Sequence, residues 1–194
     1  MRVIGIDPGS RCVGFGVVDS ATHTPHGIHV QHGVLRLDTS QPLPKRIAQL
    51  LQRLTTVLQT HKPQIAVVEE VFVSKSPRSA LLLGQARGAV LTILAAHNID
   101  VIGVRPTCLK QHLTGSGRAS KRQMSHMVAS LLQLQTPPAA DAADALALAL
   151  YQARMLSSPQ YHIATTPLPQ RKKTNSRSKR QALEQLARQR GCLS

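Results

Sequence analysis

Short apolar, β-branched segments come first in this chain and then alternate with helical segments, and this order limits the possible folds. The first two segments, Arg2–Asp7 and 13–19, are joined by the turn sequence Pro8-Gly9-Ser10-Arg11 and are predicted to pair as a hairpin. Further strands are predicted within 28–37, at Ile65–Glu69 and at 101–104. The order predicts an α/β fold, in which helices cover the faces of a mixed sheet.

Four helices are predicted between and after these strands. Apolar residues recur at helical spacing over Leu43–His61, and Pro63 ends that helix. The second helix is predicted at 79–97. The third begins near Ser120, an N-cap residue with Gln123 three positions later, and the last runs over 141–156.

The chain divides by composition into a domain at 1–156 and a basic tail at 157–194. At 194 residues and 42% hydrophobic, it has ample apolar material for one core. The tail is rich in Pro, Ser, Thr, Gln, Lys and Arg, and we expect it to be disordered.

The charge of the chain favours a polyanionic partner. It has 24 Lys and Arg against nine Asp and Glu, a formal net charge of +15, and both the domain and the tail are basic. This balance favours nucleic acid over a small-molecule substrate. No apolar run is long enough for a membrane span, no signal peptide precedes the first strand, and the three cysteines are widely spaced. We therefore expect a cytoplasmic protein without a membrane partner.

Four of the nine acidic residues stand where a metal site would need them. Asp7 and Glu69 each end an apolar strand, and Asp141 and Asp144 open a helix that is rich in alanine. Carboxylates would repel a polyanion unless they hold divalent cations. The pattern indicates a metal-dependent nuclease. The alternative is a capping aspartate, a surface pair and a turn residue without a common role.

The expected geometry allows these carboxylates to meet. Asp7 shares a strand face with Val3 and Gly5, because side chains alternate along a strand. Asp141 and Asp144 project from one face of the last helix, both in its first turn. Seven alanines between positions 139 and 149 make that helix thin enough to lie close to the sheet. Two Mg²⁺ ions suit such a set of oxygen ligands.

These residues lie in motifs that resemble those of one known family. The motifs are Gly5-Ile6-Asp7-Pro8-Gly9-Ser10, Glu69-Glu70-Val71-Phe72, Gly84-Gln85-Ala86-Arg87-Gly88 and Asp141-Ala142-Ala143-Asp144-Ala145-Leu146. In this order they resemble the signatures of RuvC, the Holliday junction resolvase family, from position 1 to about 156.

The resemblance implies a ribonuclease H-like fold and a homodimer that acts on four-way junction DNA in recombination and repair. It implies nicking of two like-polarity strands, 5′-phosphate products, and Mg²⁺, with Mn²⁺ as a possible substitute. The RuvA–RuvB branch-migration complex is the implied protein partner. The family's catalytic metal ligands fall on Asp7, Glu69, Asp141 and Asp144, while Glu70 has no family role.

Three further residues match the family pattern as DNA contacts. Lys110 and Lys121 are point charges suited to phosphate, although a lone lysine otherwise indicates a solvated helix face. Phe72 follows the Glu69 strand and would stack on an unpaired base if exposed, or belong to the core if buried.

Two repeated patterns have competing interpretations. Ala80, Gly84 and Gly88 form a smooth helix stripe, which packs either on the sheet or, as the resemblance suggests, in the dimer interface. His23, His26, His29 and His32 recur every third residue. Three-residue steps alternate faces in a strand, so we do not expect all four to converge on a metal.

Three other functions stay open at this stage. An actin-like ATPase fragment also begins with Asp-x-Gly after a strand, but this chain has no second such motif. A catalytically idle DNA-binding protein would not need four carboxylates. A ribonuclease H-like nuclease acting on RNA–DNA hybrids is compatible with the basic charge.

Overall fold

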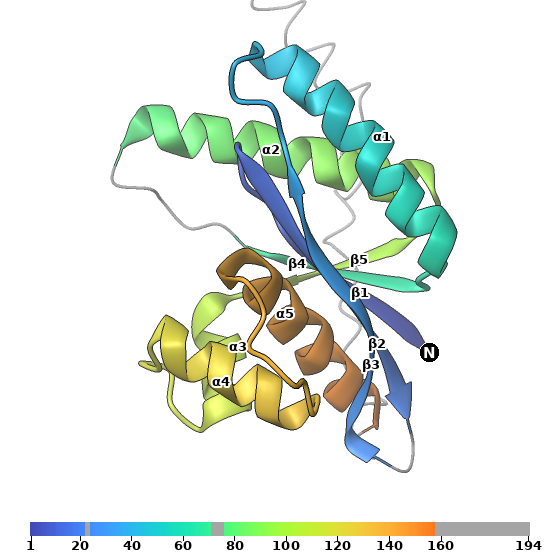
Figure 1. Ribbon diagram of the computed structural model, residues 1–194, viewed down its shortest axis with the longest axis vertical. Helices are drawn as coiled ribbons and strands as arrows, with labels where there is room; N and C mark the ends of the chain where they lie inside the picture. The colour runs from blue at the N-terminus through green and yellow to red at the C-terminus, as the bar shows by residue number, and fades with distance from the viewer. Residues whose placement is uncertain (22–23, 71–75, 158–194) are drawn as a thin grey trace, which may run out of the picture. The chain divides into compact units, whose positions relative to one another are not determined.

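The computed structural model describes residues 1–21, 24–70 and 76–157, which form a mixed five-stranded sheet with helices on both faces (Figure 1). The strands are β1 (Arg2–Asp7), β2 (Cys12–Ala21), β3 (Thr24–Arg36), β4 (Ile65–Glu69) and β5 (Asp100–Val104). Their order in the sheet is β3-β2-β1-β4-β5. The first three strands pair antiparallel, whereas β4 runs parallel to both β1 and β5. The predicted mixed α/β sheet is confirmed.

The parallel pair β1–β4 brings two strand ends to the same edge of the sheet. Ile6 pairs with Val68, and the residues that follow them are Asp7 and Glu69. Two carboxylates that lie 62 positions apart in the sequence therefore end neighbouring strands.

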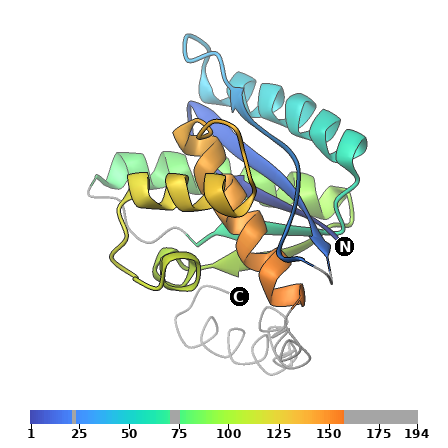
Figure 2. The ribbon, with the colours of Figure 1, turned by 60° about the horizontal axis from the view of Figure 1, so that its bottom comes forward.

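Two helices cover one face of the sheet and three cover the other (Figures 1 and 2). The helices are α1 (Leu43–His61), α2 (Pro77–Ala96), α3 (Pro106–Thr114), α4 (Lys121–Leu131) and α5 (Ala140–Ser157). Apolar residues of α1 and α2 pack with Ile4 and Ile6 of β1 in one buried cluster. A second cluster joins α3, α4 and α5 to Val3. Alternate residues of β1 therefore pack into the buried clusters on opposite faces of the sheet.

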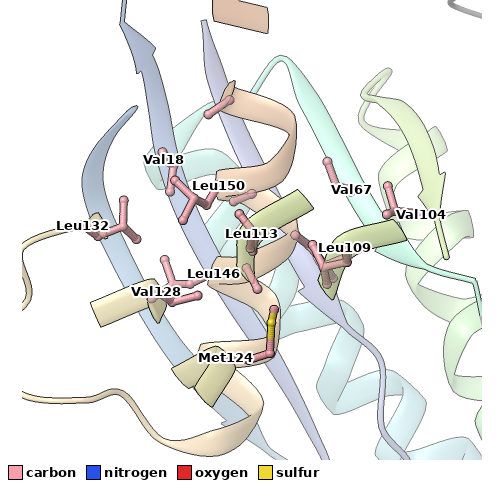
Figure 3. Close-up of a cluster of buried hydrophobic side chains, with 14 of the residues drawn as sticks. Val18, Val67, Val104, Leu109, Leu113, Met124, Val128, Leu132, Leu146 and Leu150 are labelled. Atoms are coloured by element: carbon pink, nitrogen blue, oxygen red, sulfur yellow. The ribbon is translucent and has the colours of Figure 1, made fainter. Parts of the chain in front are cut away.

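The cluster on the α5 face is shown in Figure 3. Leu109 and Leu113 of α3 and Met124 of α4 gather around Leu146 and Leu150 of α5. All five side chains are buried, so burial of apolar surface fixes α5 between the sheet and the two shorter helices.

Glycines in β1 and β2 let α5 approach the sheet closely. A Cβ added to Gly5 would lie 2.0 Å from the Ala145 carbonyl oxygen, and one added to Gly14 would lie 2.0 Å from that of Asp141. Alanines supply the matching surface on the helix, as predicted. Since Gly14 pairs with Asp7 across the β1–β2 ladder, this contact brings the start of α5 beside Asp7.

Two expectations about helices are wrong. Helix α3 was not predicted from the sequence, because nine residues give little periodicity, although Pro106 at its start and Gly115 after its end are typical helix boundaries. Helix α5 begins at Ala140, so its first turn contains Asp141 alone, and Asp144 lies beyond that turn.

The histidines of β3 also depart from the expected alternation. The β2–β3 register shifts between Val17 and Val18, so His29 pairs with Val18 while His32 pairs with Gly16. This irregularity places two histidines on one face, and their ring nitrogens lie 2.8 Å apart. Residue 23 and the side chain at 26 fall outside the described residues. The expectation that strict alternation would place His29 and His32 on opposite faces of the strand is therefore wrong.

Candidate active site

The four predicted carboxylates come from two strand ends and one helix that meet at one edge of the sheet. Asp7 and Glu69 end β1 and β4, and the close contact of α5 with Gly14 brings Asp141 to the same edge. Asp144 follows Asp141 by three positions and projects from the same face of α5.

The pKa values indicate that these carboxylates interact with one another. Burial, together with the negative charges of neighbouring Asp144, Glu69 and Asp141, raises the pKa of Asp7 to about 7, against the opposing charge of Lys121. Burial also raises the pKa of Glu69, and Asp144 adds to this effect. A cluster of this kind favours a bound cation, because a cation removes the mutual repulsion.

Both predicted lysines lie at this cluster. Lys121 Nζ donates to Asp144 Oδ2 at 3.1 Å, and this hydrogen bond is the main reason that its pKa is raised. Lys110 is close enough for its charge to lower the pKa of Glu69. A cavity of about 170 Å³ is lined by these four residues together with Pro106, Leu109, Met124 and Leu148. The lysines thus face the carboxylates rather than lie on a remote helix surface.

Two residues that form hydrogen bonds with the acidic residues were not predicted from the sequence. The Cys12 thiol donates to Asp141 Oδ2 at 3.1 Å, and burial raises its pKa to about 11, so it stays protonated as a donor. Side chains two positions apart in a strand lie on the same face, so Cys12 could have been predicted to face α5 as Gly14 does. Arg87 Nε donates to the backbone carbonyl of Glu69 at 3.2 Å, and it lies within the motif at 84–88.

The donor set fits a hard divalent cation. Carboxylate oxygens are the ligands that Mg²⁺ and Mn²⁺ take in proteins, and Asp7, Glu69, Asp141 and Asp144 supply only oxygen. Among the described residues, no three acidic, histidine or cysteine side chains form a closed ligand set as they stand. Lys121 instead provides the positive charge beside Asp144. Phe72 lies outside the described residues, so its role as a DNA contact stays a prediction.

The comparison with known families decides the identity of this arrangement. The family model described as crossover junction endodeoxyribonuclease RuvC matches residues 3–152. The chain belongs to the RuvC family. The match includes Asp7, Glu69, Asp141 and Asp144, and it includes both Lys110 and Lys121.

Individual members of the RuvC family are similar over most of their length. The RuvC of Alkalilimnicola ehrlichii is 48% identical over 149 residues, which span 77% of this chain and 88% of that protein. The RuvC of Neisseria meningitidis serogroup C is 43% identical over 153 residues, or 79% of this chain and 85% of that protein.

Solved structures agree with this assignment. The structure of Thermus thermophilus RuvC in complex with a Holliday junction substrate has a TM-score of 0.74 and 33% identity, covering 81% of this chain and 97% of that one. The yeast mitochondrial Holliday junction resolvase Ydc2 has a TM-score of 0.59 at 15% identity, covering 78% of this chain and 77% of that one, so it supports the fold alone. The predicted ribonuclease H-like fold is confirmed.

Proposed function

We propose that this protein is a metal-dependent endonuclease that resolves four-way DNA junctions by paired nicks, in the cytoplasm, during recombination and repair. One observation carries the proposal. In a chain of the RuvC family, carboxylates from β1, β4 and α5 form a single electrostatic cluster, in which repulsion adds to the raised pKa of Asp7.

The residues of the cluster have distinct parts in the proposed reaction. Nucleases of this family generally depend on divalent metal ions, and Asp7, Glu69, Asp141 and Asp144 would hold two Mg²⁺ ions, or Mn²⁺ in their place. A bound divalent ion supplies a Lewis acid that stabilises the negative charge developing on the phosphate. Cys12 holds one oxygen of Asp141, which orients that carboxylate.

The lysines and the apolar wall act on the substrate side of the site. Lys121 is exposed and offers its ammonium charge to the phosphate, while Lys110 lies beside Glu69. Leu109, Met124 and Leu148 line the cavity and reduce the access of water.

Cleavage of a synthetic four-way junction tests this function. In Mg²⁺ we expect nicks at symmetric positions in two strands of like polarity, with 5′-phosphate ends, and nearly intact linear duplex. Binding without cleavage in Mg²⁺ or Mn²⁺ would indicate an idle DNA-binding protein. Preferential cleavage of an RNA–DNA hybrid would indicate a ribonuclease H-like activity instead.

Paired nicks require two active sites, and the outer face of α2 supports a homodimer. Gly84 and Gly88 have no atom within 4 Å of an added Cβ, so this stripe does not pack on the sheet. Leu81 is 63% exposed on the same helix. A smooth helix face with an exposed leucine suits close approach of a second copy. The family's RuvA–RuvB complex is the further partner that we propose.

The apolar character of α2 has a competing explanation. Among the described helices, α2 alone is long and apolar enough to span a membrane, with a mean hydropathy of 1.5 and 22% of that stretch buried. Composition is weak support for a membrane segment, since helices of soluble proteins pass the same test. Gln85 and Arg87 also interrupt the apolar sequence, so we favour the dimer.

Replacing Leu81 with Glu tests the dimer. We expect a monomer in sedimentation, because the new charge would be buried against the partner copy. The monomer should nick one junction strand at a time and lose paired cleavage. Leu51→Glu is the matched control, since Leu51 is 49% exposed on α1. A dimeric Leu81→Glu protein that still makes paired nicks would contradict this interface.

The raised pKa of Asp7 predicts how the stability of the metal-free protein depends on pH. Its value of about 7 lies above the 3.8 of an unperturbed Asp, so the folded protein binds more protons between these pH values than the unfolded chain. Stability therefore falls as the pH rises from about 4 to about 7.

Asp7→Asn should remove this pH-dependent penalty. Without metal at pH 8, we expect the variant to melt at least about 2 °C above the wild type, and near pH 4 the difference should vanish. Added Mg²⁺ should stabilise the wild type more than the variant, because a ligand stabilises the protein that binds it. Thermal denaturation at both pH values provides the measurement. Equal melting temperatures of the variant and the wild type at pH 8 would show that the charge of Asp7 does not destabilise the folded protein.

A further inference from the structure

A larger hollow lies at the same edge of the sheet as the carboxylates, on the face covered by α1 and α2. Its volume is about 700 Å³, and its lining includes Ser10 and Arg11 from the β1–β2 turn and Arg46 from α1. Ser79 of α2 and Thr39 complete the polar part of the wall. Figure 1 shows α1 and α2 on the side of the sheet opposite α5, so the turn separates this hollow from the carboxylates.

The guanidinium groups give this hollow its charge. Arg46 Nη1 donates to the Ser10 carbonyl oxygen at 2.6 Å, which anchors the turn that follows Asp7. Arg46 Nε is buried and has no hydrogen-bond partner among the residues that the structure describes. Arg11 is exposed at the rim. Two guanidinium groups that line one hollow form a site suited to an oxygen-rich anion.

The surrounding backbone adds to this preference for an anion. Arg46 and Ser79 lie in or just after the first turns of α1 and α2, and neither first turn contains an acidic residue. Helix starts carry partial positive charge and favour anions. No carboxylate lies in the described lining. The acidic residue next to Thr39 in the sequence is Asp38, which does not line the hollow. Its carboxylate instead accepts hydrogen bonds from the backbone nitrogen and hydroxyl of Ser40.

We propose that this hollow, the Arg11–Arg46 site, binds a backbone phosphate of a DNA strand that crosses the β1–β2 turn from the carboxylate cluster. Arg11 contacts the phosphate, and Arg46 holds the turn while its charge faces the hollow. The assignment rests on the proposed function for the identity of the DNA. Because Ser10 lies three positions after Asp7, a phosphate held here would also fix the strand relative to Asp7.

The net charge of the chain supports DNA rather than a free anion as the occupant of this hollow. Ser10, Thr39 and Ser79 line the hollow, and their hydroxyls suit any phosphate, while Arg11 at the rim stays exposed to a larger partner. A chain with a net charge of +15 attracts a polyanion more strongly than it attracts a single small ion.

Equilibrium binding of a labelled four-way junction by the full chain, without divalent metal and at several salt concentrations, tests the site. For Arg11→Ala we expect affinity to fall roughly tenfold, as for loss of a hydrogen bond to a charged group. The slope of log K against log[salt] should lessen by about 0.9, because one phosphate contact is lost. Linear duplex should show the same change in slope, since a phosphate contact does not read sequence.

Arg53→Ala is the matched control. Arg53 lies on the same helix as Arg46 and also donates to a backbone carbonyl, that of Arg36, but it does not line the hollow. Its affinity and salt slope should equal those of the wild type. Arg46→Lys keeps the charge but loses the forked donor, so an affinity loss with an unchanged melting temperature would further support the site.

An Arg11→Ala protein with the wild-type affinity and salt slope would overturn the proposal. Stabilisation of the wild type by inorganic phosphate, combined with unchanged DNA binding in Arg11→Ala, would assign the hollow to a free anion and also overturn it. Since binding is measured without metal, this result is independent of whether the junction is cleaved. Failure of cleavage alone would count against the proposed nuclease function and not against this site.

Discussion

Replacing Asp7 with Asn is expected to reduce junction cleavage by at least about a thousandfold, a loss of about 4 kcal/mol of transition-state stabilisation. Asp7 lies at the end of β1 and is surrounded by the charges of Asp144, Glu69 and Asp141. The amide keeps the shape of the side chain but loses the charge that a divalent cation requires. Junction binding should survive, because the removed charge repels DNA.

Single-turnover cleavage and binding titrations with the same junction provide the measurement. Glu70→Gln is the matched control, since it makes the same chemical change one position after Glu69, outside the proposed metal ligands. We expect Glu70→Gln to cleave at nearly the wild-type rate. Wild-type rates from Asp7→Asn in Mg²⁺, or a loss of activity only in Glu70→Gln, would refute the assignment of the ligands.

Replacing Gly5 with Ala is expected to lower the free energy of unfolding by about 3 kcal/mol or more. The added Cβ would lie 2.0 Å from the Ala145 carbonyl oxygen and 2.6 Å from the Ala149 nitrogen. Both atoms belong to the α5 backbone, so a rotamer change cannot relieve the overlap. The helix would have to move away from the sheet, and Asp141 and Asp144 would move with it.

Urea denaturation measures the loss, and Gly103→Ala is the control. A Cβ on Gly103 of β5 would lie 2.9 Å from Glu70 Oε1, the end of a flexible side chain that can turn away. We expect that substitution to change the unfolding free energy by less than about 1 kcal/mol. If Gly5→Ala were as stable as Gly103→Ala, the close contact of α5 with the sheet would be wrong.

The local elements could be predicted because their signals lie within each segment. Leu43–His61 and Ile65–Glu69 have the predicted bounds, and Ser120 caps α4 with Gln123 as the sequence indicates. Asp7 was placed on the face of Val3 by alternation alone. In each case neighbouring residues determine which side of an element is apolar, and that pattern survives in the fold.

Features that depend on packing between distant segments could not be predicted. The leucines of helix α3 dock in the cluster around α5, and the His29–His32 contact depends on a shift in the β2–β3 register. Solvent exposure of Gly84 and Gly88 depends on which face of α2 meets the sheet. None of these can be derived from the spacing of residues.

For the candidate site, the sequence alone determined which carboxylates end strands or open a helix, and its motifs determined the family. Only the tertiary structure decided which side chains contact Asp141 and the turn that follows Asp7. The Cys12 thiol reaches Asp141 across 129 positions, and Arg46 holds the carbonyl of Ser10 across 36. Residue periodicity reports burial within one element, whereas these contacts depend on how closely α5 and α1 approach the β1–β2 hairpin. That approach is set by the glycines of the sheet and the packing of both helices.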